Sequence, residues 1–374
     1  MLHVVKITFL MDGFDIGGTE LNATRTLESF GRRGLLVDVM HFHADGPLRS
    51  RILAAGHRLT YVPISPLSSP RILSRVLALA AAIRAAGATA VHTQDVYSNI
   101  LGVAAARVLL RRAVITSRRW KDDVPRKALT PMNAWAHRHS ALVLPNSLAL
   151  VPTLQSEGVA DSRIAVHENF IDDAALTLLP EEARQAWRRA VGVRDSAVVV
   201  GCVARLSRVK RHDVLLDAFA IARRAVPDMQ LLLVGDGDMR TAISEQARQL
   251  GIMRDLIFTG TLPNSPLPQQ LFDIAVLTSE NEGFPNSLVE ASACGVPLIA
   301  TPVGGTTDVL LDDRTGILVS VNDSASTASA ITALAHDRTR RERYGAAARK
   351  EVTARFSETA AIDRLLTLYR RVSA

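Results

Sequence analysis

Short apolar segments alternate with helical segments along almost the whole chain, and this alternation is what most constrains the fold. In the first half the predicted strands are Val4–Met11, Leu35–Phe42, Leu59–Ile64, Ala90–Thr93, Ala113–Thr116, Ala141–Leu144 and Ile164–His167. The pattern restarts with Ala197–Ala204, Leu231–Gly237, Leu256–Thr259, Ile274–Leu277, Pro297–Thr301 and Thr315–Val319. Strands that alternate with helices form parallel sheets covered on both faces, so each half predicts a doubly wound α/β domain.

The length of 374 residues is sufficient for two domains of ordinary size. We expect a first Rossmann-like domain over residues 1–170, a charged helical linker over 171–195, and a second Rossmann-like domain over 196–355. Residues 356–374 are predicted to form a C-terminal helix.

The stretch Ser279–Gly305 has the pattern of a phosphate-binding site. A buried strand ends at Leu277, a glycine loop follows, and a helix is predicted from Pro285 to Cys294. Proline is favoured at the first helical position, and the first N–H groups of a helix have no partner within it. We therefore expect the N–H groups of Asn286, Ser287 and Leu288 to face an anion.

Two glutamates, Glu282 and Glu290, are eight residues apart in this stretch. One lies in the loop and the other about one turn into the helix, so both can point into a crevice at the carboxyl end of a strand. Carboxylates beside an anion site are suited to sugar or ribose hydroxyls. The alternative is two solvated acids on an amphipathic segment.

The segment E-G-F-P-N-S-L-V-E, residues 282–290, resembles the E-x7-E motif of glycosyltransferase family 4. These are retaining, nucleotide-sugar-dependent enzymes with the GT-B fold of two facing Rossmann-like domains. The resemblance implies that Glu290 binds the nucleotide ribose, that Glu282 lies near the donor sugar, and that the final helix crosses back to the first domain. The diphosphate is expected to meet the backbone of four residues: Phe284, Pro285, Asn286 and Ser287.

Further motifs in both halves support the resemblance. Arg205 and Lys210 match an R-L-x-x-x-K pair that neutralises the leaving diphosphate, although alone they could be two solvated loop cations. Gly235 matches a V-G-x-G turn at the donor site. Asp236-Gly237-Asp238 formally fits D-x-D, a metal–diphosphate motif of another fold, but we predict a turn here and no bound metal.

Two glycine-rich turns complete the expected donor site. Gly17 and Gly18 resemble the G-G-x-E turn, whose backbone approaches the donor phosphates and sugar. Asp308 stands where the family has glutamate in G-G-x-x-E, and could touch the donor sugar.

One family feature is missing, because many relatives have a functional histidine after the strand predicted at Ala113–Thr116. Here Arg118 or Arg119 occupies that place; an arginine stays protonated, so it could bind phosphate or stabilise charge but not act as a base. His92, at the end of the strand Ala90–Thr93, is the remaining catalytic candidate. A structural histidine near the core is the alternative.

Composition limits compartment and partners. The two cysteines, Cys202 and Cys294, lie in apolar contexts, which favours a reducing, cytoplasmic location. No run of eighteen apolar residues is present. The net charge of +7, concentrated between Arg107 and Arg138, fits either a solvated face or a peripheral contact with the inner face of the membrane. With 5% aromatic residues and no zinc-ligand spacing, a nucleic-acid partner is not expected.

The resemblance therefore predicts a metal-independent, retaining hexosyltransferase without a cofactor. The donor is a nucleoside-diphosphate sugar, UDP in preference to GDP. The acceptor is a glycan, as in cell-surface polysaccharide synthesis, a lipid-linked sugar or a small molecule, recognised by loops such as Ser65–Arg71 and Arg118–Asn133. Two alternatives stay open: a GT-B-type nucleotide-sugar epimerase and a non-catalytic nucleotide-sugar-binding protein.

Overall fold

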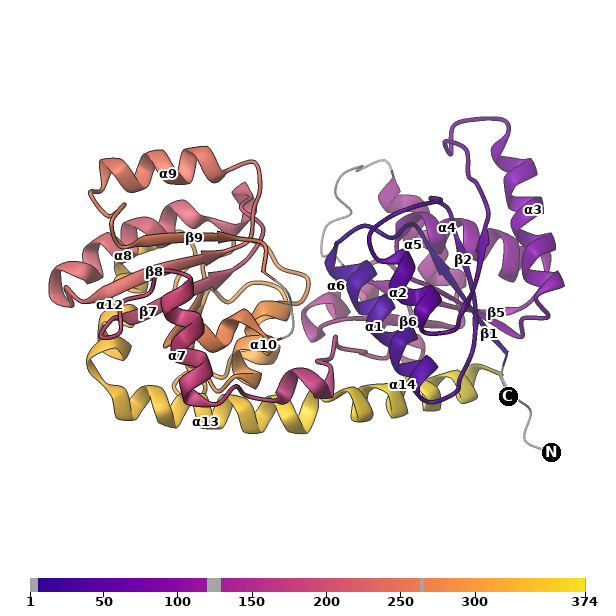
Figure 1. Cartoon of the computed structure of the whole chain (residues 1–374). Coiled ribbons are helices and arrows are strands. Elements are labelled where there is room, and N and C mark those ends of the chain that lie inside the picture. Colours follow the sequence, from indigo (N-terminus) through magenta and orange to yellow (C-terminus); the bar gives the residue numbers. More distant parts are fainter. Residues whose placement is uncertain (1–5, 120–128, 263–265, 374) are drawn as a thin grey trace. The chain divides into compact units, whose positions relative to one another are not determined.

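The computed structural model describes residues 6–119, 129–262 and 266–373. The chain divides into two compact units, one formed by Met1–Asn169 with Glu358–Ala374 and the other by Phe170–Ser357. Each unit is a parallel sheet with helices on its faces (Figure 1). Residues 120–128, which include much of the predicted loop Arg118–Asn133, lie outside the described residues.

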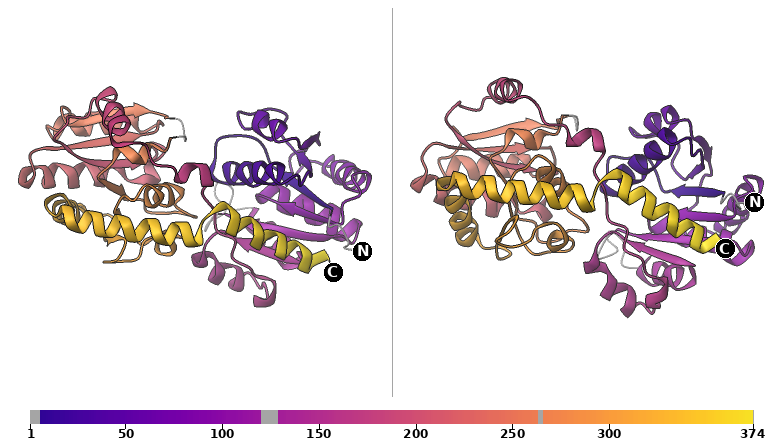
Figure 2. Two further views of the ribbon diagram at one scale, coloured as in Figure 1. Left: turned by 60° about the horizontal axis from the view of Figure 1, so that its bottom comes forward. Right: turned by 90° about the horizontal axis from the view of Figure 1, so that it is seen from below.

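The described part of the first unit contains a six-stranded parallel sheet in the order β3-β2-β1-β4-β5-β6. Its strands are β1 Ile7–Met11, β2 Asp38–His41, β3 Arg58–Tyr61, β4 Ala90–Thr93, β5 Ala113–Arg118 and β6 Leu142–Pro145. Its helices are α1 Gly18–Arg32, α2 Arg49–Ala54, α3 Ile72–Ala85, α4 Val96–Gly102, α5 Thr130–His139, α6 Val151–Ser156 and α14 Glu358–Ser373. The last of these packs against α1, so the two ends of the chain's described part meet in one unit (Figure 2).

The second unit repeats the architecture, with the strand order β12-β11-β10-β7-β8-β9 in its described part. Its strands are β7 Val198–Val203, β8 Met229–Val234, β9 Leu256–Gly260, β10 Ile274–Leu277, β11 Leu298–Ala300 and β12 Gly316–Leu318. Its helices are α7 Glu181–Ala190, α8 His212–Ala225, α9 Arg240–Gln249, α10 Asn286–Ala293, α11 Thr306–Val309, α12 Ser324–His336 and α13 Arg338–Arg355.

The central strands are apolar because helices cover both faces of each sheet. Every residue of β10 and β8 is buried, and so is every residue of β4. Continuous apolar runs, rather than alternating ones, are typical of such doubly covered parallel strands. The predicted α/β class, with two doubly wound domains, is confirmed.

Two local predictions are wrong. Ile164–His167 is not a strand: it makes a single bridge from Ile164 to Val143 of β6, and β6 ends at Pro145, which has no N–H to extend the ladder. The linker is helical mainly at α7, which begins after Pro180 and ends before Gly192 at φ +92°.

Among the described residues, no helix combines the length and apolarity needed to cross a bilayer.

Candidate functional site

The second unit has a topological switch point between β7 and β10. After β7 the chain crosses to β8 on one side, and after β10 it crosses to β11 on the other side. The loops that follow these two neighbouring strands therefore lie next to each other at the carboxyl edge of the sheet. Open α/β sheets bind ligands at such crevices. The loop after β7 carries Arg205 and Lys210, and the loop after β10 carries Glu282.

Backbone and hydroxyl hydrogen bonds join the two loops. The Glu280 N–H donates to the carbonyl oxygen of Val209 at 3.0 Å. The Thr278 hydroxyl donates to the carbonyl oxygen of Arg211 at 2.9 Å. Residues 71 and 67 positions apart in the chain are thereby held beside one another.

Lys210 and Glu282 form an ion pair at this junction. The Lys210 Nζ lies 2.5 Å from Glu282 Oε1, and only 8% of the Glu282 side chain is exposed. The Ser279 hydroxyl donates to the same oxygen at 2.6 Å. Ser279 is itself fixed, because its carbonyl oxygen accepts a hydrogen bond from the Thr301 hydroxyl.

The loop that carries Glu282 packs directly on the glycine turn after β11. A Cβ atom at Gly304, where φ is +51°, would lie 1.6 Å from the carbonyl oxygen of Glu282. The Gly305 N–H donates to the carbonyl oxygen of Gly283 at 3.1 Å. Only glycine fits at position 304, for both conformational and steric reasons.

Arg211 adopts a left-handed backbone conformation, with φ +50°, at the N-terminus of α8. Its guanidinium pairs with Asp213 at 2.8 Å and Glu280 at 3.3 Å, and also donates to Asn322. Hydrogen bonding to Asp213 raises the pKa of Arg211. These contacts stabilise a backbone conformation that is unfavourable for arginine and fix the turn that presents Lys210.

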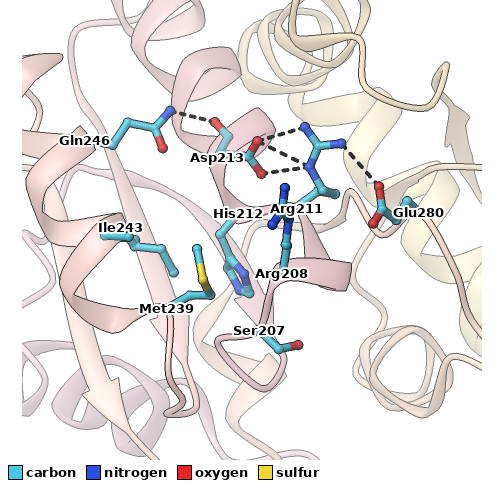
Figure 3. A pocket seen from close by; sticks show the side chains of 10 residues that line it. Ser207, Arg208, Arg211, His212, Asp213, Met239, Ile243, Gln246 and Glu280 are labelled. Carbon is cyan, nitrogen blue, oxygen red and sulfur yellow. Dashed lines mark hydrogen bonds and ion pairs between the residues drawn. The ribbon is translucent and has the colours of Figure 1, made fainter. Parts of the chain in front are cut away.

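Arg205 is exposed and its guanidinium has no partner among the described residues. It belongs to the loop that also borders a cavity of about 500 Å³ between the first turns of α8 and α9. Figure 3 shows Arg211 bound to Asp213 and Glu280 at the rim, with Met239 and Ile243 lining the apolar side. The ion pairs of Arg211 therefore fix this loop, while the Arg205 guanidinium stays available to a ligand.

Glu290 is buried on α10 and faces a short 3₁₀ turn, Pro268–Leu271. Its Oε2 accepts a hydrogen bond from Gln269 Nε2 at 2.9 Å. Gln269 Oε1 is buried and has no partner in the structure. The amide fixes the orientation of the carboxylate that is predicted to bind ribose.

The start of α10 differs from the prediction. The helix begins at Asn286, and Pro285 is its N-cap rather than its first residue. The N–H of Asn286 donates to Phe284 O, and that of Leu288 to Pro285 O, at 3.1 and 3.0 Å. The tight turn before the helix thus uses two of the three N–H groups expected to face an anion, and only the Ser287 N–H has no backbone acceptor in the described structure.

The other predicted donor residues of this unit are close to the same loops. Phe284 packs edge-on against Phe356, with ring centroids 5.6 Å apart. Gly235, at φ +133°, has no room for a side chain, since a Cβ would lie 2.1 Å from Ala204 O. Asp308 is buried in α11, which follows the Gly304 turn.

Asp236 lies in a turn, where its carboxylate accepts from the Gly237 N–H at 2.8 Å. No cluster of three or more potential metal ligands occurs among the residues that the structure describes.

In the first unit, Gly17 is the N-cap of α1 and Gly18 is its first residue. The Glu20 side chain folds back over this turn: a Cβ at Gly17 would lie 2.3 Å from Glu20 Oε2. Burial, with Asp95 and Asp15 nearby, raises the pKa of Glu20 to about 7. Burial also raises the pKa of Asp12 to about 6, although Ser98 and Tyr97 donate to it.

His92 is buried, and both of its ring nitrogens have partners. Nδ1 lies 2.6 Å from the Tyr369 hydroxyl and Nε2 lies 3.1 Å from the Ser117 hydroxyl. Burial, with Arg119 and His167 nearby, lowers the pKa of His92 well below its usual value. This placement ties β4 to α14 and agrees better with the structural alternative than with a catalytic role.

Arg118 and Arg119 have different surroundings although both are buried. Arg118 pairs with Glu157 at 3.2 Å. Arg119 donates to Asn169 Oδ1 at 3.1 Å and has no carboxylate partner among the described residues.

The structure thus brings Lys210 and Glu282 together, with Arg205 in the same loop and Glu290 on the adjoining helix. Sequence reasoning missed Ser279, Gln269 and Arg211, and it gave no separate role to Glu20, the glutamate of the G-G-x-E turn. Ser279 lies within the motif region and could have been found as a neighbour of Glu282. The contacts of Gln269 and Arg211 depend on tertiary packing.

Comparison with known proteins defines the class. Residues 183–351 match the family model described as glycosyl transferases group 1, and residues 16–175 match the model described as Glycosyltransferase Family 4. A D-inositol 3-phosphate glycosyltransferase of Corynebacterium urealyticum is 27% identical, over 95% of this chain and 91% of that protein. A GDP-mannose-dependent phosphatidylinositol monomannoside mannosyltransferase of Mycolicibacterium smegmatis is 33% identical, over 45% of this chain and 46% of its own length.

Solved structures agree on the fold. Anabaena Alr3699/HepE, crystallised with UDP, superposes with a TM-score of 0.85 at 22% identity, covering 97% of this chain and 99% of that one. A sucrose-phosphate synthase from Thermosynechococcus elongatus superposes with a TM-score of 0.82 at 20% identity, covering 98% and 99%. The chain belongs to glycosyltransferase family 4, with the GT-B fold.

Proposed function

We propose that this glycosyltransferase moves a hexose from a nucleoside-diphosphate sugar, UDP in preference to GDP, to an acceptor hydroxyl with retention of configuration and without a metal. One observation carries the proposal. The loops after β7 and β10 place Arg205, Lys210 and Glu282 at one switch point, beside the helix that bears Glu290. This is a set of cations, carboxylates and a helix N-terminus suited to a diphosphate with sugars on either side.

Each residue has a defined task in this proposal. Glu290, oriented by Gln269, accepts hydrogen bonds from the ribose hydroxyls. Glu282, oriented by Ser279, accepts from the donor sugar. Arg205 and Lys210 bind the diphosphate, together with the Ser287 N–H at the start of α10.

Catalysis would come mainly from charge stabilisation as the diphosphate departs. Arg205 and Lys210 take the place that a metal has in other glycosyltransferases. Removing one well-placed donor of this kind lowers turnover by roughly 10²–10³-fold. The acceptor attacks from the face that the diphosphate leaves, and a leaving phosphate oxygen takes the acceptor proton.

The relatives support a range of donors and acceptors. The mycobacterial relative uses GDP-mannose, whereas the Anabaena protein was crystallised with UDP. The named acceptors include an inositol phosphate and a phosphatidylinositol mannoside. A cytoplasmic enzyme acting on a small molecule, a glycan or a lipid-linked acceptor at the inner membrane face agrees with the net charge of +7.

The test is a thermal-shift titration with UDP and GDP, followed by donor turnover. A ligand that binds only the folded state raises the midpoint. Glu290→Ala should abolish the UDP shift, and Arg205→Ala should lower turnover by about 10²-fold. Glu245→Ala and Arg224→Ala, at exposed helix positions, are the controls. Full activity in both site variants at saturating acceptor would exclude this site.

Products separate the alternatives. Conversion of the donor alone into an isomeric nucleotide sugar would indicate an epimerase. UDP binding without transfer or donor hydrolysis above background would indicate a non-catalytic binding protein.

A further inference from the structure

A buried arginine in the first unit has no carboxylate in ion-pair contact among the described residues. Arg119 follows β5 directly and is 5% exposed. Its guanidinium makes one hydrogen bond, from Nη1 to Asn169 Oδ1 at 3.1 Å. Among the described residues, Nε is buried without a partner, and the contact of Nη1 with Asn169 leaves Nη2 without a hydrogen bond. These two N–H groups lie on the same edge of the guanidinium plane and form a fork that matches two oxygens of one anion.

The neighbouring groups do not compensate the charge. His92 and His167 are both neutral: burial, then the proximity of Arg119, depresses the pKa of each, to about 3 for His167. Burial raises the pKa of Tyr369, so its hydroxyl keeps its proton. Asp95 attracts Arg119 from a distance, but its carboxylate caps α4 through the Val96 N–H.

The adjacent arginine provides the contrast. Arg118 is equally buried, and Glu157 neutralises it at 3.2 Å. A buried charge is normally paired or ligand-bound, because removing it from water is unfavourable. Arg118 has such a direct partner. Arg119 has only the more distant Asp95 among the described residues, and a bound anion would supply the contact.

Further unsatisfied polar atoms surround Arg119. Among the described residues, both buried ring nitrogens of His167 lack partners, and His167 is close enough for Arg119 to depress its pKa. Asn146, whose Nδ2 donates to the carbonyl oxygen of Arg119, has a buried Oδ1 without a partner. A neutral imidazole supplies one N–H donor to an anion.

We propose that Arg119 is the centre of an oxyanion subsite in the first unit, which takes a phosphate or carboxylate group carried by the acceptor. That the anion belongs to the acceptor rests on the proposed function; that Arg119 binds an anion does not. It selects for anionic acceptors over neutral sugars, since a neutral group would leave the guanidinium unpaired.

The experiment uses the full chain saturated with UDP, to which inorganic phosphate is added at constant ionic strength. We expect a further rise in the thermal midpoint for the wild type, and a phosphate Kd at least about tenfold weaker in Arg119→Met. Arg84→Met, an exposed arginine of the same unit, should retain the wild-type response. Arg119→Lys keeps the charge without the fork and should give an intermediate Kd, which is informative even if the methionine variant is unstable.

Three results would overturn the subsite: no phosphate response in the wild type, an unchanged Kd in Arg119→Met, or an unchanged Kd in Arg119→Lys. The Kd for UDP shows whether the anion that Arg119 binds belongs to the acceptor or to the donor. An unchanged UDP Kd in Arg119→Lys supports the acceptor, and a tenfold weaker one assigns Arg119 to the donor and rejects the proposal. A protein that never responds to UDP would contradict the proposed function, while its phosphate response would still test Arg119.

Discussion

The Nζ atom of Lys210 lies 2.5 Å from Oε1 of Glu282, across two loops that leave adjacent strands of the second unit. The pair is mostly buried, with 22% of the lysine and 8% of the glutamate side chain exposed. Without a donor, each charge therefore neutralises the other. In the proposed function, a bound diphosphate pairs with Lys210, and Glu282 then accepts hydrogen bonds from the sugar hydroxyls.

We predict that this ion pair stabilises the folded protein by linking the two loops. Lys210→Met and Glu282→Gln should each lower the free energy of unfolding, because each leaves a partly buried charge without its partner. The double variant should lose less than the sum of the two, with a coupling of at least about 1 kcal/mol. Urea denaturation of all four proteins measures it, and strict additivity would show that the pair contributes nothing.

Much of the fold could be predicted, because burial on both faces makes strand sequences continuously apolar. The predicted bounds of Ile274–Leu277 and Ala90–Thr93 equal the observed strands. Ile164–His167 has the apolar sequence of a strand, but it forms only one bridge to β6, which ends at Pro145.

The candidate site was predictable only in part. Glu282, Glu290, Arg205 and Lys210 could be selected from their spacing, and Gly235 from its turn. The contact between Lys210 and Glu282 depends on β10 lying beside β7, a pairing between residues about 74 positions apart that no local pattern encodes. The difference between Arg118 and Arg119 likewise depends on which of two consecutive side chains meets Glu157.

Gly304 should be intolerant of any side chain. In Gly304→Ala the new Cβ would meet the carbonyl oxygen of Glu282 at 1.6 Å, so the Glu282 loop must move. We expect loss of donor turnover by at least about tenfold, since small displacements of site residues have such effects.

Gly251→Ala is the matched control for this substitution. Its φ is also positive, +69°, but nothing lies within 4 Å of the new Cβ. It should lose about 1 kcal/mol of stability from backbone strain and keep its turnover. Equal turnover in the two variants, measured with one donor and acceptor, would refute the steric argument.

Ser279 should be required for the orientation of Glu282 rather than for folding. Ser279→Ala removes the 2.6 Å hydrogen bond to Oε1 and should reduce kcat severalfold with about 1 kcal/mol of destabilisation. Ser292→Ala is the control: that serine is also fully buried, but its hydroxyl has no partner, so its removal should be neutral or stabilising. Steady-state kinetics and urea denaturation of both variants test this, and an unchanged kcat in Ser279→Ala would contradict it.

Acid should destabilise the first unit through His167. Burial lowers the pKa of this imidazole in the folded protein to about 3, below its ordinary value of 6.5. Between these values the unfolded chain binds one more proton than the folded one, so stability falls as the pH drops from about 6.5 towards 3 and is level above 6.5. The raised pKa values of Asp12 and Glu20 act in the opposite direction, so the difference between variants is the useful quantity.

In His167→Gln the slope of unfolding free energy against pH, between pH 4.5 and 6, should be smaller by about 1.4 kcal/mol per pH unit than in the wild type. The exposed His139→Gln serves as the control, and parallel slopes in wild type and His167→Gln would show that His167 does not titrate between the two states.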